Sequence, residues 1–251
     1  MIEPYLEKHG KAALLFSGGI DSLALLEHTK DFHDKIIALY CDTGAAFPHV
    51  RQFVVDTLER YGIEYYIVKS DVMRFQADNG IPADIVPISY TKVISEAKRE
   101  EPSVKVVQWT ACCMNCLWLP MIRFVKDLGL SLVLRGHKKA DELNGVDSGT
   151  IEDGITVINP LDDWSDKDVE EFLESRGIGV PRQYGEMKDS LDCYCCTAPL
   201  FGGLNKARKR LLFMKRYYPL QYETLVKHLD DVYGAALVEI NNLGILLEEV
   251  G

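Results

Sequence analysis

The sequence predicts an α/β fold, in which a parallel, twisted five-stranded sheet carries helices on both faces and a helical C-terminal region follows. Two observations predict it. Short apolar segments alternate with amphipathic helical patterns along the first 198 residues, an order typical of parallel sheets with right-handed crossovers. From Pro199 onward the strand patterns stop and the helical ones continue. We therefore expect an α/β domain over residues 1–198 and a helical region over residues 199–251.

Each predicted element has its own signal. The strand segments are short apolar runs: Ala12–Phe16, Ile36–Tyr40, Tyr65–Val68, Ser131–Arg135 and Ile155–Ile158. The clearest helix is Pro48–Tyr61, which has an apolar stripe and stops at Gly62. Another starts after Ser165, an N-cap residue followed by acids, and stops at Gly177. Ligands of such sheets bind beyond the carboxyl ends of the strands, so we look for the site there.

Composition narrows the setting. With 47% hydrophobic and 26% charged residues among 251, the chain resembles an ordinary globular protein with a sizeable core. No apolar run reaches the roughly 18 residues of a membrane span. The N-terminal segment MIEPYLEKHG is acidic and lacks a signal-peptide core, so we expect a cytoplasmic protein without membrane contact.

Charge bears on possible partners. The net charge of −10 argues against a broad electrostatic surface for nucleic acid, but not against a local one. Six Lys or Arg residues lie between Lys206 and Arg216. This run is either a solvated helix face or a patch that binds a nucleic-acid backbone, or the sulfate or phosphate of a small substrate.

The stretch SGGIDS, residues 17–22, stands between a strand and a helix. Gly18 and Gly19 allow a sharp turn and a close approach of a ligand to the main chain. Unpaired N–H groups at the start of the helix then point at the same place as the helix dipole, which is the chemistry of a phosphate site. Asp21 repels phosphate, so we expect it to help hold Mg²⁺ or to organise the loop. The alternative is a glycine-rich turn with no ligand.

Six of the seven cysteines fall in two clusters, ACCMNC and DCYCC: Cys112, Cys113, Cys116, Cys193, Cys195 and Cys196. A reducing compartment favours metal binding or redox chemistry over disulfides. On spacing alone, four thiolates suit Zn²⁺ or an iron–sulfur cluster equally well. Cys41 ends an apolar run and is most simply a core residue.

Four motifs in one order resemble the phosphoadenosine phosphosulfate reductase family of the PP-loop ATP pyrophosphatases, the adenine nucleotide alpha-hydrolase-like superfamily. SGGIDS matches the S-G-G-x-D-S signature, and CDTGAAFP is similar to the D-T-G-x-x-F-P segment. NPLDDWSDKDV resembles the P-L-x-x-W-[ST]-x-x-D-V helix, and DCYCCTAP the G-C-x-x-C-T segment. The resemblance covers about residues 10 to 200 and implies the α/β fold of that superfamily.

The resemblance implies a site for ATP and Mg²⁺. The nucleotide-binding residues that it implies are Ser17, Gly18, Gly19, Asp21, Ser22, Asp42, Thr43, Gly44, Arg135, Gly136 and His137. Asp21, Ser22 and Asp42 are the catalytic candidates among them. Asp42 has an alternative role as a cap of the following turn, and a lone histidine such as His137 is often only a hydrogen-bonding residue.

The resemblance also implies a metal. In iron–sulfur members of the family, a C-C…C-x-x-C arrangement like that of Cys112, Cys113, Cys193 and Cys196 ligates a [4Fe–4S] cluster, with Zn²⁺ as the alternative here. Locally the chain is similar to tRNA thiolases, because Cys113-x-x-Cys116 precedes a helix, a strand and the stretch GHKKADE. There three cysteines hold the cluster and an open iron carries sulfide. Cys195 and the unused member of the first cluster are then spare, or carry a persulfide.

Two departures from the family select the reaction. Residues 197–251 hold no cysteine, whereas reductases of the family place a nucleophilic cysteine in an E-C-G-L-H segment there. The SGGIDS loop is whole, whereas reductases often degrade it. We therefore expect ATP cleavage between the α and β phosphates and sulfur transfer to an adenylated acceptor, either a nucleic acid or a small molecule. A sulfur-donor protein and a second copy of the chain are the protein partners expected.

Two other functions remain open. The first is a phosphoadenylyl-sulfate or adenylyl-sulfate reductase that obtains its thiol elsewhere. The second is a nucleotide-binding iron–sulfur subunit of a complex that modifies DNA or RNA with sulfur. Release of pyrophosphate from ATP separates sulfur transfer from reduction, and strict dependence on a partner indicates the subunit.

Overall fold

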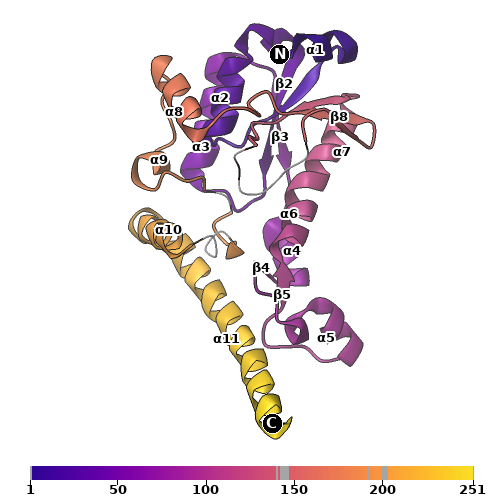
Figure 1. The fold of residues 1–251 in the computed structure, drawn as a ribbon, viewed down its shortest axis with the longest axis vertical. Helices are drawn as coiled ribbons and strands as arrows, with labels where there is room; N and C mark the ends of the chain where they lie inside the picture. The colour runs from indigo at the N-terminus through magenta and orange to yellow at the C-terminus, as the bar shows by residue number, and fades with distance from the viewer. Residues whose placement is uncertain (1, 140, 142–146, 192, 199–202, 251) are drawn as a thin grey trace. The chain divides into compact units, whose positions relative to one another are not determined.

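The computed structural model describes residues 2–139, 141, 147–191, 193–198 and 203–250, and Figure 1 shows its elements. The chain divides into two compact units. The first unit contains Met1–Asp42, Ala46–Lys69 and Leu119–Leu191, and the second contains Thr43–Ala45, Ser70–Trp118 and Asp192–Gly251. The boundary expected after residue 198 adjoins residues 199–202, which lie outside the described residues, and it stays a prediction.

The first unit is built on a six-stranded sheet with the order β3-β2-β1-β6-β8-β7. Its strands are β1 (Ala12–Leu15), β2 (Ile36–Asp42), β3 (Tyr65–Lys69), β6 (Leu132–Leu134), β7 (Thr150–Glu152) and β8 (Ile155–Ile158). The five predicted strands are confirmed, and they form the parallel part of the sheet. β7 is a sixth strand that the sequence analysis missed, and it pairs antiparallel with β8 across a turn at Asp153 and Gly154. Both turn residues have positive φ, as tight hairpin turns require.

The helices of this unit cover both faces of the sheet. They are α1 (Glu3–His9), α2 (Ile20–His28), α3 (Pro48–Tyr61), α7 (Leu119–Asp127), α8 (Asp166–Ser175) and α9 (Gln183–Glu186), with a 3-10 turn at Lys30–Lys35. In Figure 1, α2, α3 and α8 lie to the left of β2 and β3, and α7 lies to the right of these two strands. β1 and β2 are buried almost throughout, as strands covered on both faces must be.

The predicted helix signals are confirmed where they can be checked. α3 ends at Gly62, which adopts the left-handed conformation with φ 60°. α8 begins with a capping box, in which the Ser165 hydroxyl accepts from the Asp168 N–H and the Asp168 carboxylate accepts from the Ser165 N–H. This cap fixes the first turn of α8, which carries Asp166.

The second unit holds a two-stranded parallel sheet and several helices. Its elements are α4 (Val72–Asn79), β4 (Ile81–Ala83), a 3-10 turn at Ile88–Tyr90, α5 (Lys92–Lys98), β5 (Val106–Gln108), α6 (Trp109–Cys113), a π-helical turn at Met114–Trp118, α10 (Leu204–Tyr217) and α11 (Pro219–Val250). Ile81, Ala83 and Val106 of the small sheet pack with Val232 and Ala235 of α11.

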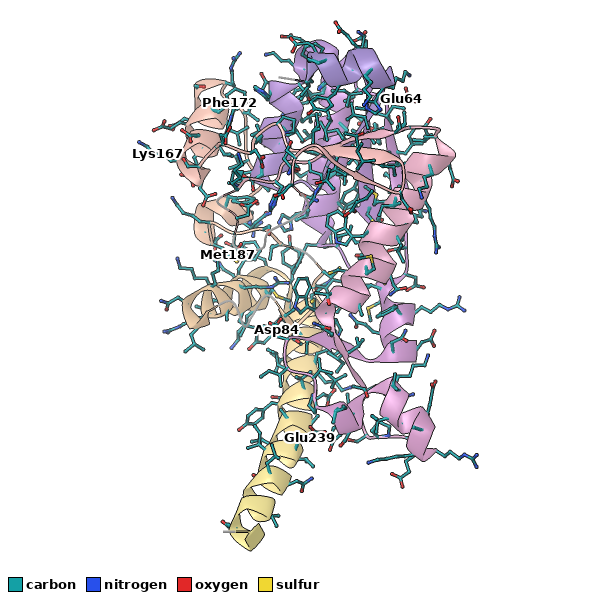
Figure 2. The ribbon with its side chains drawn as sticks, turned by 45° about the vertical axis from the view of Figure 1, so that its right-hand side comes forward. Glu64, Asp84, Lys167, Phe172, Met187 and Glu239 are labelled. Carbon is teal, nitrogen blue, oxygen red and sulfur yellow. The ribbon has the colours of Figure 1, made fainter. Side chains whose placement is uncertain are left out.

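α11 is tied to this unit by polar contacts as well. The Glu239 carboxylate accepts a hydrogen bond from the Ser89 N–H at 2.7 Å, and Figure 2 labels Glu239 on the helix. The region predicted to be helical is therefore helical over residues 204–217 and 219–250. Within the described part of the chain, no helix is both long and apolar enough to cross a membrane.

Candidate functional site

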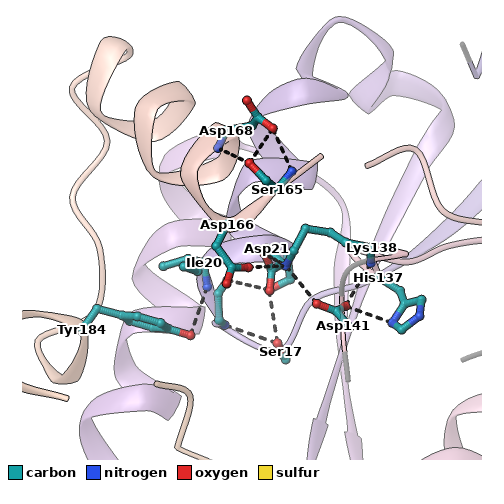
Figure 3. Close-up of polar contacts among 12 residues, drawn as sticks. Ser17, Ile20, Asp21, His137, Lys138, Asp141, Ser165, Asp166, Asp168 and Tyr184 are labelled. Atoms are coloured by element: carbon teal, nitrogen blue, oxygen red, sulfur yellow. Dashed lines mark hydrogen bonds and ion pairs between the residues drawn. The ribbon is translucent and has the colours of Figure 1, made fainter. Parts of the chain in front are cut away.

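Residues 17–22, called here the phosphate loop, form the turn between β1 and α2 (Figure 3). Gly18 has φ +82°, and a Cβ there would lie 2.8 Å from Val54 Cγ2, so both conformation and space require glycine. The Gly19 N–H donates to Ser17 Oγ at 3.2 Å, and Ser22 Oγ donates to the Gly19 carbonyl at 2.9 Å. The two serine hydroxyls are 3.2 Å apart. The loop therefore gathers hydroxyl and N–H groups at the start of a helix.

The first N–H of α2 has a partner that the sequence analysis missed. Ile20 N donates to the hydroxyl of Tyr184 at 3.3 Å, and Tyr184 comes from α9 (Figure 3). A Cβ on Gly19 would lie 3.2 Å from the same hydroxyl. Helix N-termini attract anions because their N–H groups lack partners within the helix. A neutral oxygen therefore lies at the position where this chemistry would favour a phosphate oxygen.

Gly136, which follows β6, packs directly against the phosphate loop. A Cβ on Gly136 would lie 2.8 Å from the Asp21 carbonyl carbon and 2.9 Å from Ser22 N, distances that only glycine avoids. This close approach brings the stretch after β6 against the start of α2. Gly136 thus has a clear packing role beside the nucleotide role expected for it.

Lys138 is the main feature of the site that the sequence analysis missed. Its side chain is almost fully buried, and its Nζ lies 2.5 Å from Asp21, 3.2 Å from Asp141 and 3.3 Å from Asp166 (Figure 3). The three carboxylates come from α2, from the stretch after β6 and from the capped first turn of α8. In sequence Lys138 looks like an ordinary surface lysine, and only its place after a predicted strand could have drawn attention to it.

The electrostatics of this cluster favour cations. The pKa of Asp21 is raised, chiefly by burial and further by the negative charges of Asp141 and Asp166. The ion pair with Lys138 lowers this pKa, but by less. Burial opposes the charge on Lys138, but hydrogen bonds and ion pairs with Asp21 and Asp141 raise its pKa. The ammonium of Lys138 thus pairs with three carboxylates, so the cluster has an excess of negative charge. It lies beside the phosphate loop, whose N–H groups suit anions.

The other residues expected after β6 lie at the same edge. His137 Nδ1 is 3.0 Å from the Asp141 carboxylate. Arg135 is half-buried. Burial lowers its pKa, and the negative charges of Glu152 and Asp141 offset only part of this effect. Ala140 and Glu142 of the same stretch lie outside the described residues.

The three residues expected from the D-T-G segment are divided between the units. Asp42 ends β2 in the first unit, and its carboxylate accepts from Arg51 Nε at 2.9 Å. Thr43 and Gly44 belong to the second unit. The Thr43 hydroxyl lies 3.1 Å from the Cys193 thiol, and Tyr194 N donates to the Ala45 carbonyl. The structure therefore places Thr43 beside a cysteine.

The two cysteine clusters both belong to the second unit, where Cys112, Cys116, Cys193 and Cys195 pack together, and a metal site shared by them stays a prediction. We call these six residues the cysteine group: Cys112, Cys113, Cys116, Cys193, Cys195 and Cys196. Burial raises the pKa of Cys112, and the charges that Cys116, Cys113, Cys193 and Cys196 would carry raise it further. Burial likewise raises the pKa of Cys196 to about 12, with Cys113 contributing. Cys41 is buried in β2 and belongs to the first unit, whereas the cysteine group belongs to the second.

The donor chemistry of the cysteine group fits a thiophilic metal centre. Its six residues are thiols that form no disulfide within the described structure, and besides burial the neighbouring thiolate charges raise the pKa of Cys112 because like charges repel. A bound cation reverses this repulsion and deprotonates the thiols that it binds. In the described part of the chain, no three Cys, His, Asp or Glu side chains are already arranged around one metal-ion position.

Replacing Asp21 with Asn is expected to raise the free energy of unfolding at about pH 7. Because the pKa of Asp21 is raised in the folded protein, its ionisation weakens the fold as pH rises above the unfolded value of 3.8. The gain should vanish at lower pH, where the carboxyl is protonated in both states. Urea unfolding of both proteins between about pH 3 and pH 8 measures it.

Asp163→Asn is the matched control of opposite sign. The ion pair with Lys139 lowers the pKa of Asp163, so its charge stabilises the fold above the unfolded pKa, and this substitution should cost stability at about pH 7. If Asp21→Asn lowered the free energy of unfolding as Asp163→Asn does, this account of the cluster would be contradicted.

With the geometry established, comparisons with known proteins place the chain. The crystal structure of phosphoadenylyl-sulfate (PAPS) reductase from Candida auris, a phosphate complex, is similar to it, with a TM-score of 0.50 and 17% sequence identity. The likeness covers 73% of this chain and 81% of that one, and at this identity it shows the fold alone. No curated protein matches the sequence.

A family model decides the family. The model described as "Phosphoadenosine phosphosulfate reductase domain" matches residues 11–199, which include the phosphate loop and both cysteine clusters. The iron–sulfur type and the likeness to tRNA thiolases stay predictions. Because the match spans well over half of the chain, this protein belongs to the phosphoadenosine phosphosulfate reductase domain family.

Proposed function

We propose that this protein is an ATP pyrophosphatase-type sulfurtransferase. It binds ATP with Mg²⁺ at the phosphate loop, transfers AMP to an acceptor and then assists replacement of AMP by sulfur. The observation that carries the proposal is the intact loop, in which glycine turns, serine hydroxyls and the start of α2 offer donors suited to a pyrophosphate.

Each step of this reaction has residues that suit it. An acceptor oxygen attacks the α-phosphorus, the bond between that phosphorus and the α–β bridging oxygen breaks, and pyrophosphate leaves with the electron pair. In the proposed reaction Ser17, Gly19 and Ser22, whose N–H and hydroxyl groups bond within the loop in this structure, donate instead to the negatively charged leaving group. The negative cluster around Lys138 suits Mg²⁺, with Asp21 as its proposed ligand. A sulfur nucleophile then displaces AMP from the acceptor.

The cysteine group is the proposed site of a [4Fe–4S] cluster. Cys112, Cys113, Cys193 and Cys196 would hold it, or three cysteines including Cys116 in the manner of the thiolases. A cluster bound there supplies iron that can carry sulfide, and a sulfur-donor protein supplies the sulfur. Zn²⁺ on the same thiolates is the alternative, with a structural role.

The acceptor is proposed to be a polyanion, either RNA or DNA, that binds at α10. This helix contains no acidic residue, and its exposed cations are Lys206, Arg208, Lys209, Lys215 and Arg216. A hollow between α10 and α11 is lined by Leu204, Leu211 and Tyr222 together with Arg208 and Lys215. Arg210, which the sequence grouped with this run, is instead buried and does not belong to the exposed face.

The second candidate is a sulfonucleotide reductase, which the family itself favours. In that reaction a thiolate attacks the sulfur of the sulfonucleotide, so a nucleophilic cysteine is needed. Residues 197–251 offer none, and Cys195 is fully buried. A third candidate is a nucleotide-binding subunit that acts only within a sulfur-modification complex.

The isolated protein is expected to bind ATP in a Mg²⁺-dependent way and to release pyrophosphate when single-stranded RNA or DNA serves as acceptor. Sulfite release from phosphoadenylyl sulfate with thioredoxin should be undetectable. Calorimetry and the two product assays measure these outcomes. Robust sulfite production would overturn the proposal in favour of the reductase.

A loop variant tests where this chemistry takes place. The double variant Asp21→Ala, Ser22→Ala should lose ATP turnover, because it removes the proposed Mg²⁺ ligand and one hydroxyl of the loop, and circular dichroism checks that the variant is folded. Ser175→Ala, at the end of α8, is the control that should retain turnover, since its exposed hydroxyl donates to the Phe172 carbonyl within the same helix. Unchanged ATP affinity in the double variant would remove the loop from the mechanism.

Anaerobically purified protein is expected to contain iron and sulfide and to absorb visible light as iron–sulfur clusters do. Cys113→Ser and Cys193→Ser should each lose this absorption, because each removes a thiolate ligand. Cys41→Ser should retain it. Colourless wild-type protein with stoichiometric zinc would replace the cluster with a zinc site.

The double variant Arg208→Gln, Lys209→Gln should weaken binding of a mixed-sequence single-stranded oligonucleotide. The slope of log K against log salt should fall by about 0.7 for each phosphate that the variant no longer neutralises, while ATP affinity stays the same. Lys188→Gln, an exposed lysine paired with Glu170, is the control. Equal salt slopes for all three proteins would exclude α10 as the binding surface.

A further inference from the structure

Arg210 is a buried cation for which the described residues provide no anion. The side chain lies on α10 and is 5% exposed. Its Nη2 donates to the Cys193 carbonyl at 3.1 Å, whereas its Nε is buried and has no hydrogen-bond partner within the described residues. No carboxylate in the described part of the chain forms a salt bridge with it. Since a guanidinium stays charged at all ordinary pH values, this burial needs compensation.

Arg210 contacts the segment that carries Cys193, Cys195 and Cys196. Its own hydrogen bond goes to the main chain of Cys193, at the start of the same turn. The guanidinium is therefore directed at the segment that carries three of the six cysteines.

Other side chains also hold this segment in place. Gln76 Nε2, from α4, donates to Cys195 Sγ at 3.1 Å. His228 Nδ1, from α11, lies 2.9 Å from the Cys195 carbonyl. The Thr197 hydroxyl donates to the Pro82 carbonyl. The turn is thus anchored by several side chains besides Arg210, and anchoring alone does not explain a buried guanidinium.

We infer that Arg210 is the internal counter-ion of an anionic, thiolate-ligated centre held by the cysteine group. The inference rests on the proposed function only in requiring such a centre. Four thiolates around Zn²⁺ or around an oxidised [4Fe–4S] core give the same net charge of about −2, so it holds for either. Arg210 is a positioning residue that acts through electrostatics and ligand orientation, and it has no part in bond making.

The inference predicts opposite effects of Arg210 in the loaded and the metal-free protein. With the centre bound, the guanidinium faces negative charge and stabilises it. Without the centre, the same buried charge lacks an anion, so its removal costs little. A residue that served only to hold the Cys193 carbonyl would stabilise both forms equally, which gives the test its control.

The experiment compares Arg210→Met, Arg210→Lys and the wild type, each reconstituted anaerobically and then divided into loaded and chelator-stripped samples. Arg210→Met should retain metal about 10- to 100-fold less tightly in chelator competition. Its loaded form should unfold roughly 5 °C lower than the wild type, while its stripped form unfolds at the same temperature or higher. Arg210→Lys keeps the charge and should recover part of the retention. Lys227→Met, an exposed lysine of α11, should change neither.

The outcomes separate this inference from the proposed function. Equal destabilisation of both forms by Arg210→Met, or no effect on the loaded form, overturns the counter-ion role while the metal content of the wild type stands. Stoichiometric zinc in the wild type overturns the iron–sulfur proposal and leaves the inference intact. A wild type that retains neither iron nor zinc overturns both.

Discussion

The close contact between the main chain of Gly136 and that of Asp21 is the constraint on which the candidate nucleotide site depends. No side chain fits between these two segments, so the end of β6 and the start of α2 are held at backbone distance. Lys138 follows two residues later and is thereby buried beside Asp21, where the capped first turn of α8 adds Asp166. The ammonium of Lys138 thus forms ion pairs with three elements that are distant in sequence. The arrangement combines anion-binding N–H groups with an excess of carboxylates, as a nucleotide bound with its metal requires.

Much of this could be predicted from sequence because the signals are local. Apolar runs fix the five parallel strands, Gly62 and the Ser165–Asp168 pair fix helix ends, and two glycines fix the phosphate loop. What escaped prediction depends on tertiary context. β7 is three residues long with an exposed Ile151, too short for any periodic signal. Lys138, Tyr184 and Arg210 look like surface residues in sequence, and only packing shows that the two cations are buried and that Tyr184 caps a helix.

For the cysteines, the sequence predicts the grouping but not the residues that anchor them. Their grouping in two clusters predicts a shared site, and all six belong to one unit, while the shared site itself stays a prediction. The polar groups that anchor them come from α4, α10 and α11, however, and nothing in their sequence marks Gln76 or His228 for that role. Helices α10 and α11 therefore support the cysteine turn, and α10 also carries the exposed lysines and arginines.

The interleaving of the two units has a consequence for the order of folding during synthesis. The second unit needs residues 192–251 to complete a core begun by residues 70–118, and the whole segment Leu119–Leu191 of the first unit is made in between. Chain segments this far apart in sequence pair slowly, because loop closure costs entropy before the contacts repay it. The first unit is complete once Leu191 leaves the ribosome, whereas Cys112, Cys113 and Cys116 wait for the rest of their group. During that interval their thiols lack the neighbours that later bury them, so we expect them to be more accessible to oxidants in the nascent chain than in the complete protein.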